Sequence, residues 1–299
     1  MDLSLAIALG ITLVIAILLI VFNDIPNEKL NYQKHLQSVS FTPDYMATIT
    51  DLQHRLSILQ LEKYSQLIEQ RLVPMLKFDI ASATGEPLKI GQSKIGGYCD
   101  SPMAKSLSNN SFLLQINCHD LYLSMDKTSF DASKNQQFFI QNELFRDGIL
   151  YFFLDKDKME KEKQNFVEVQ YYPSLTDLAT CKKQKTISTK DSYVIHFVSA
   201  LSLPDAHTQW VRETFVNFEQ EGYYKLINTE NCNQISGYPQ SITQYFDFNP
   251  KDKLLLLQLE NIDMINQLPK WSRIYVFVDR QKAQAKDFSE LTSYMQQFE

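Results

Sequence analysis

The chain has 299 residues, of which 44% are hydrophobic and 21% charged, and its formal net charge at pH 7 is -6. This length is enough for one large domain or two small ones with a buried core, and the composition is that of an ordinary globular protein. Because binding to nucleic-acid phosphates needs clustered Lys and Arg, the negative charge argues against a nucleic-acid partner.

The chain begins with an apolar segment. Residues 3–22 carry no charged side chain, and a helix of this length spans about 30 Å, the hydrocarbon thickness of a bilayer. A cleaved signal peptide is the alternative, but Asp2 stands where a basic start is usual and no small-x-small site ends the run. We therefore predict a single-pass anchor at residues 1–22 that holds the protein in the cell membrane. Lys29 and Lys34 after it favour a cytoplasmic location for the C-terminal domain.

The next segments predict a linker and a helix. Residues 23–41 are polar and contain Pro26, which is typical of a juxtamembrane linker. Residues 42–44, Thr-Pro-Asp, resemble a helix N-terminus, and apolar residues at helical spacing continue from there until Pro74.

Short apolar runs dominate the rest of the chain. Those at residues 112–117 and 149–154 are typical of buried strands, and residues 193–198 predict a further strand. A helix is expected to begin at Pro204 and to end at Gly222.

Four sequence blocks occur twice in the same order, which predicts an internal duplication. They lie at residues 92–98, 112–117, 148–155 and 165–167, and again at residues 234–239, 255–259, 274–279 and 287–288. We expect one domain at residues 42–299 with related halves at about 42–172 and 193–299. Because strands and a few helices mix without regular alternation, the fold class expected is α+β, with buried sheets and few helices after one transmembrane helix.

These blocks resemble the YwqG-like (DUF1963) family, whose pattern runs roughly S-K-x-G-G-x-P, then L-x-Q-I/L-N, then G-x-L-x-F-F. The resemblance covers about Val73 to the end and is looser in the second half. Cys99 stands where the family usually has Pro, and Ser236 replaces the first Gly of the second Gly-Gly pair. The family's D-P-R after the second Gly-Tyr-Pro is absent. Since the family has no settled activity, the resemblance implies a fold more than a function.

Seven residues of the repeated blocks are candidates for ligand binding: Lys94, Gly96, Gly97, Tyr98, Gln115, Asn117 and Gln258. The amides of the glycine pair, with Lys94, suit an anionic group, although glycines also simply permit a tight turn. Gln115 and Gln258 are polar positions in apolar runs, where a buried amide has to be hydrogen-bonded. They indicate either a structural network that ties the halves together or a ligand pocket between the halves.

No known catalytic pattern occurs, so no catalytic residue and no cofactor are predicted, and whether the protein is an enzyme stays open. The four cysteines lack a C-x-x-C pair and the five histidines lack ligand spacing, so no metal site is predicted either. Asp155 and Asp279 match across the halves and are interpreted as caps of a following turn or helix, with a paired-carboxylate site as the alternative.

We expect a membrane-anchored, non-catalytic protein-interaction module with a protein partner, of the immunity or envelope-assembly type. The alternative is a small-molecule sensor or an enzyme with a pocket between the halves. A polar pocket lined by both halves favours the alternative, and an exposed apolar patch favours the interaction module.

Overall fold

The computed structural model describes residues 31–42, 44–83, 88–125, 146–187, 192–227, 233–242, 248–260 and 272–297. The predicted membrane anchor at residues 1–22 lies outside these ranges. Among the helices in the described ranges, none is both long and apolar enough to cross a bilayer.

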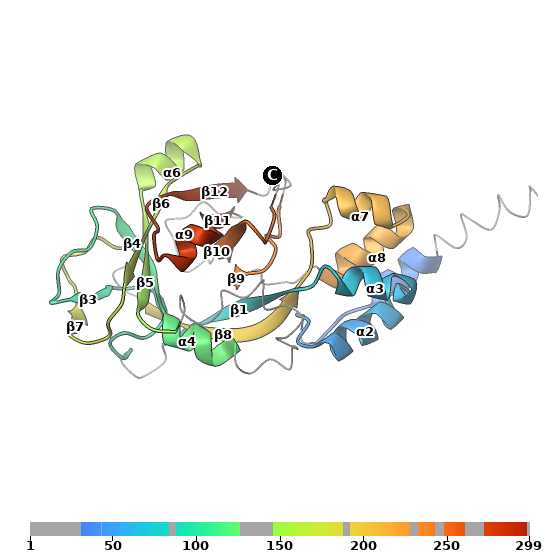
Figure 1. The fold of residues 1–299 in the computed structure, drawn as a ribbon, viewed down its shortest axis with the longest axis horizontal. Coiled ribbons are helices and arrows are strands. Elements are labelled where there is room, and N and C mark those ends of the chain that lie inside the picture. The colour runs from blue at the N-terminus through green and yellow to red at the C-terminus, as the bar shows by residue number, and fades with distance from the viewer. Residues whose placement is uncertain are drawn as a thin grey trace, which may run out of the picture.

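Ten strands form one sheet in the order β12-β11-β10-β9-β1-β8-β2-β4-β5-β6, and every neighbouring pair is antiparallel (Figure 1). The first five in chain order are β1 (Val73–Ser82), β2 (Lys94–Gly96), β4 (Ser111–Asn117), β5 (Ile149–Leu154) and β6 (Val167–Tyr172). The others are β8 (Ser192–Ser202), β9 (Gln234–Ser236), β10 (Lys253–Glu260), β11 (Ser272–Asp279) and β12 (Leu291–Gln297). A separate two-stranded sheet pairs β3 (Asp100–Pro102) with β7 (Leu178–Thr180).

The large sheet contains two equivalent sets of strands around the central pair β1 and β8. One set runs β2-β4-β5-β6 and the other runs β9-β10-β11-β12, while β1 pairs with β9 and β8 pairs with β2. A β-bulge interrupts β4 between Phe112 and Leu114, and another interrupts β10 between Leu255 and Leu257. The apolar runs in β4 and β10 therefore occupy equivalent positions, and both are buried as predicted.

The predicted α+β class is wrong, because the described chain is mainly one antiparallel, barrel-like sheet with few helices. The apolar runs correctly predicted buried strands, but these strands belong to a single curved sheet. Its inner face encloses one core that contains Leu114 and Leu150 from the first half and Leu257 and Val276 from the second. Loops cover the outer face, where Phe153 belongs to a smaller cluster, so β5 is apolar on both faces.

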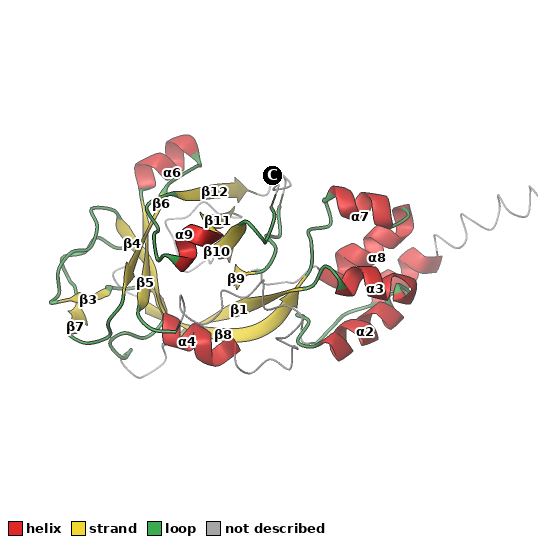
Figure 2. Ribbon diagram, viewed as in Figure 1, coloured by secondary structure: helices red, strands yellow, loops and turns green. Residues whose placement is uncertain are grey.

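Most helices gather at one end of the molecule, away from β3 and β7 (Figures 1 and 2). They are α2 (Ile49–Ile58), the 3₁₀-helix η1 (Glu62–Tyr64), α3 (Ser65–Glu69), α7 (Gln209–Thr214) and α8 (Asn217–Ile227). Residues 31–38, in the predicted linker, are also helical, and Tyr32 and Leu36 pack into the core of this group. In the described ranges, the helices that flank the sheet are α4 (Cys118–Met125), α6 (Lys156–Glu162) and α9 (Arg280–Gln284).

The predicted helix boundaries are wrong at both helices. The helix expected up to Pro74 is divided into α2, η1 and α3 and ends at Glu69, because Pro74 lies inside β1. The helix expected from Pro204 begins only at Gln209 and is divided into α7 and α8. The helix expected from residue 42 begins only at Ile49, where the side chain of Thr48 accepts a hydrogen bond from the Asp51 N–H. Gly222 lies inside α8 rather than at its end. A Cβ atom at this glycine would come within 2.1 Å of the Tyr32 hydroxyl, so close packing rather than helix termination requires glycine there.

Candidate functional site

The loop after β2 is held by a glutamine and a tyrosine from neighbouring strands. Gln115 accepts a hydrogen bond from the Asp100 N–H at 2.9 Å and donates to the Gln92 carbonyl at 2.9 Å. The Tyr151 hydroxyl donates to the Asp100 carbonyl at 2.5 Å. Since Gln115 and Tyr151 are buried, they fix the backbone where the loop leaves the sheet.

The second half repeats this arrangement with the equivalent residues. Gln258 accepts a hydrogen bond from the Gln240 N–H at 2.9 Å, and the Tyr275 hydroxyl donates to the Gln240 carbonyl at 2.8 Å. The predicted hydrogen bonding of both glutamines is thus present. These hydrogen bonds join Gln115 to Asp100 and Gln258 to Gln240, each within its own half of the chain.

Lys94 forms a buried ion pair. Its Nζ lies 2.9 Å from Asp100 Oδ2, and both side chains are almost completely buried. The same oxygen also accepts hydrogen bonds from the Gly91 N–H and from Gln115 Nε2, each at 2.9 Å. The ammonium group of Lys94, which was expected to assist anion binding, therefore pairs with the carboxylate of Asp100.

The glycine pair serves a tight turn beside β8. Gly96 and Gly97 have φ angles of 70° and 63°, values that glycine adopts without strain. A Cβ atom at Gly97 would meet the Ser192 side chain at 1.7 Å. Close packing thus accounts for the second glycine. Tyr98 is half-buried. Asn117 Nδ2 donates a hydrogen bond to the Gly91 carbonyl at 2.9 Å, so its side chain contacts the segment before β2. Ligand binding by these residues stays a prediction.

The segment just before the edge strand β6 pairs with β12, the other edge strand of the sheet, over a short stretch. The Asn165 N–H donates to the Ser293 carbonyl at 2.8 Å, and the Met295 N–H donates to the Lys163 carbonyl at 3.1 Å. An isolated bridge joins Gln164 with Tyr294. These contacts nearly close the sheet on itself and join the first half to the second.

Beyond Ser293 the two edges separate. The buried Ser293 hydroxyl accepts hydrogen bonds from the N–H groups of Phe166 and Val167, at 2.9 and 3.1 Å. A side chain thus takes the place of backbone pairing at this point. Further along, a groove of about 720 Å³ lies between β6 and the segment before β12.

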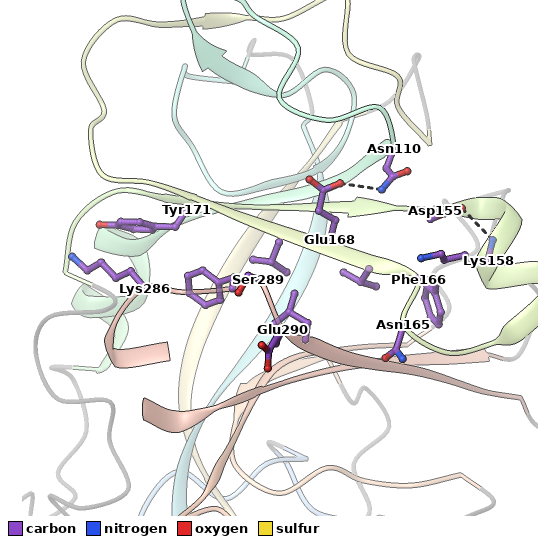
Figure 3. A pocket seen from close by; sticks show the side chains of 14 residues that line it. Asn110, Asp155, Lys158, Asn165, Phe166, Glu168, Tyr171, Lys286, Ser289 and Glu290 are labelled. Atoms are coloured by element: carbon purple, nitrogen blue, oxygen red, sulfur yellow. Dashed lines mark hydrogen bonds between the residues drawn. The ribbon is translucent and has the colours of Figure 1, made fainter. Parts of the chain in front are cut away.

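Both halves line this seam groove (Figure 3). Its charged residues are Asp155, Lys158, Glu168, Lys286 and Glu290. Figure 3 shows Lys286 near Tyr171 at one end, Glu168 further along, and Lys158 toward the other end. The lining also includes Asn110, Asn165, Phe166, Val167, Val169, Tyr171, Phe288, Ser289 and Leu291.

Hydrogen bonds fix the orientation of Glu168 in the groove. Its carboxylate accepts hydrogen bonds from the Ser108 hydroxyl at 2.5 Å, Asn110 Nδ2 at 3.0 Å and Gln170 Nε2 at 2.6 Å. The ammonium of Lys286 lies 5.0 Å from the centre of the Tyr171 ring. The groove therefore offers oriented charges of both signs. In the ranges that the structure describes, no group of side chains is arranged to hold a metal ion.

The sequence patterns did not predict the groove, although one repeated block contributes residues to it. Residues 165–167 and 287–288 form the fourth repeated block, and most of them line the groove. Asp155 and Asp279, by contrast, act as the predicted helix caps: their side chains accept hydrogen bonds from the first N–H groups of α6 and α9.

The comparisons with known proteins identify the family of the chain. None of the curated proteins matches this chain significantly. A family model described as a domain of unknown function, DUF1963, matches residues 93–296, which contain both Gly-Tyr loops and both edges of the seam. The match covers more than half of the chain and agrees with the resemblance of the repeated blocks, so the protein belongs to the DUF1963 family.

Proposed function

We propose that the DUF1963 domain is a non-catalytic protein-interaction module that holds an extended segment of a partner protein in the seam groove. The observation that carries this proposal is the separation of β6 from β12 beyond Ser293, next to a groove lined by both halves.

The hydrogen-bonding pattern of β6 supports an extended ligand. The Asp155 N–H donates to the Phe166 carbonyl, so alternate residues from there on, beginning with Glu168, bond to β5. The backbone groups of Val169 and Tyr171 then point away from β5, toward the groove. An extended peptide can pair with such groups as an added strand, in the mode known as β-augmentation.

The chemistry of the groove also suits a peptide. Small-molecule sites are usually concave and mostly apolar, whereas five charged side chains line this one. Glu168 can receive a basic side chain, and Lys158 and Lys286 can receive acidic ones, whereas Glu290 forms an ion pair with Lys282. We therefore favour a polar segment that carries both charges over a small apolar ligand.

Peptide selection tests this proposal. Linear peptides selected from a random library on the full chain should lose affinity at least tenfold in Glu168→Lys and Lys286→Glu, because the altered charge repels its former partner. Glu160→Lys and Lys182→Glu are matched controls outside the groove and should bind normally. Fluorescence anisotropy measures each affinity.

The mode of binding is tested on the peptide instead of the protein. N-methylation removes one backbone donor at a time. It should abolish binding at alternate positions, those that face β6, and be tolerated between them. The proposal is wrong if the selected peptides bind the two charge variants as tightly as the wild type and tolerate N-methylation at every position.

Attachment to a membrane through residues 3–22 is the second part of the proposal, and the uncharged apolar run supports it. The full chain is expected to sediment with membranes, whereas a chain that lacks residues 1–22 should stay in solution with an unchanged circular dichroism spectrum. Cell fractionation followed by immunoblotting measures this. Recovery of the uncleaved full chain in the supernatant would contradict attachment.

A further inference from the structure

We infer that Cys99 and Cys181 form a redox modification site, at which a disulfide joins the residue before β3 to the residue after β7. This inference goes beyond peptide binding and does not depend on it. It rests on the alignment of two buried thiols across a strand pair.

The register of the small sheet places the two cysteines opposite each other. Asp100 pairs with Thr180 in the antiparallel ladder, so Cys99 faces Cys181 one step further along. The Cys181 N–H donates to the Cys99 carbonyl at 2.9 Å, which continues the ladder to this pair. Opposed residues in such a hydrogen-bonded pair have Cα atoms about 5.5 Å apart, within the range that disulfides span.

The two thiols share one apolar environment. Both are fully buried in a cluster that also contains Phe112, Tyr151 and Phe153. Both are free thiols in this structure, and Cys181 Sγ donates to the Ala104 carbonyl at 3.2 Å. Burial raises the pKa of the Cys99 thiol to about 12. Because the thiolate is the reactive form, oxidation of this pair should be slow at neutral pH and faster as the pH rises.

The pair is connected to one wall of the seam groove. Gln184, three residues after Cys181, is buried and accepts hydrogen bonds from the N–H groups of Leu107 and Ser108. Its Nε2 donates to the Asn110 carbonyl at 2.8 Å. A disulfide would therefore link Cys99 to the segment of Cys181 and Gln184, which holds the loop of Asn110 by hydrogen bonds.

A small-molecule disulfide such as oxidised glutathione supplies the oxidising equivalents, and local opening of the β3–β7 sheet gives it access to the buried thiols. One cysteine thiolate attacks a sulfur of this reagent, forms a mixed disulfide and releases one glutathione thiolate. The second cysteine thiolate then attacks the protein sulfur of the mixed disulfide and releases the other. The two protein thiols give up two protons and two electrons, and one molecule of oxidised glutathione takes them up to become two molecules of reduced glutathione.

The test uses the full chain, incubated with excess oxidised glutathione at pH 7 and pH 9. The remaining thiols are then blocked, and the disulfide is mapped by mass spectrometry. We expect two of the four cysteines to be lost as free thiols, a Cys99–Cys181 linked peptide, and faster formation at pH 9. Cys118 is also buried and free, so Cys118→Ser should keep the link, while Cys181→Ser should abolish it.

The wild-type map is decisive even where a variant fails to fold. A wild-type chain that keeps four reduced thiols at both pH values would overturn the inference. A mapped disulfide between any other pair of cysteines would overturn it as well.

Discussion

Asp100→Ala is expected to lower the free energy of unfolding by about 3–5 kcal/mol, because it leaves a buried ammonium group without its counterion. The Asp100 carboxylate is the ion-pair partner of Lys94, and both side chains are almost fully buried. It also accepts the Gly91 N–H and Gln115 Nε2. The Thr180 hydroxyl donates to the other carboxylate oxygen of Asp100 at 3.4 Å. Alanine leaves all four donors without this acceptor.

Removal of both charges separates the ion pair from the rest of the effect. The double variant Lys94→Met with Asp100→Ala should cost less than Asp100→Ala alone, since no uncompensated buried charge remains. Denaturant unfolding of the folded domain measures each free energy. Glu160→Ala, at an exposed position of α6, is the control and should change stability by less than about 0.5 kcal/mol. A double variant less stable than Asp100→Ala would contradict the ion-pair argument.

The second large effect is expected at the two equivalent glutamines. Gln115→Leu should cost about 1–3 kcal/mol, because the Asp100 N–H and the Gln92 carbonyl lose a buried partner. Gln258→Leu should cost a similar amount, since it leaves the Gln240 N–H without the amide oxygen. Neither glutamine lines the seam groove, so peptide binding by the folded fraction should stay normal.

Thermal unfolding beside the anisotropy assay distinguishes a structural role from a ligand-binding role. Gln281→Leu, at an exposed position of α9, is the matched control and should unfold like the wild type. Normal unfolding of Gln115→Leu together with loss of binding would favour the earlier interpretation of these residues as ligand contacts. If both glutamine variants unfold like the wild type, the structural argument fails.

Local sequence patterns were sufficient for the features that short segments control. The apolar runs in β4 and β10 are buried because a continuous apolar stretch has no face that favours water. The repeated blocks indicated the correct family. Asp155 and Asp279 cap helices because the carboxylate of a cap residue accepts the first N–H groups of its own helix.

Features that depend on distant strand pairing were decided by the tertiary structure alone. The spacing of apolar residues indicates whether a strand is buried. A buried strand has the same sequence pattern in two packed sheets and in one curved sheet, so the expected α+β class was wrong. The partner of Lys94 could not be assigned because Asp100 lies beyond a turn whose path depends on β8. The groove lies where two edges that are more than a hundred residues apart in the chain diverge, next to the hydrogen bonds of the Ser293 hydroxyl. Such contacts follow from the closure of the whole sheet. The repeated block at residues 165–167 and 287–288 supplies groove residues, but neither copy indicates that the two meet in space.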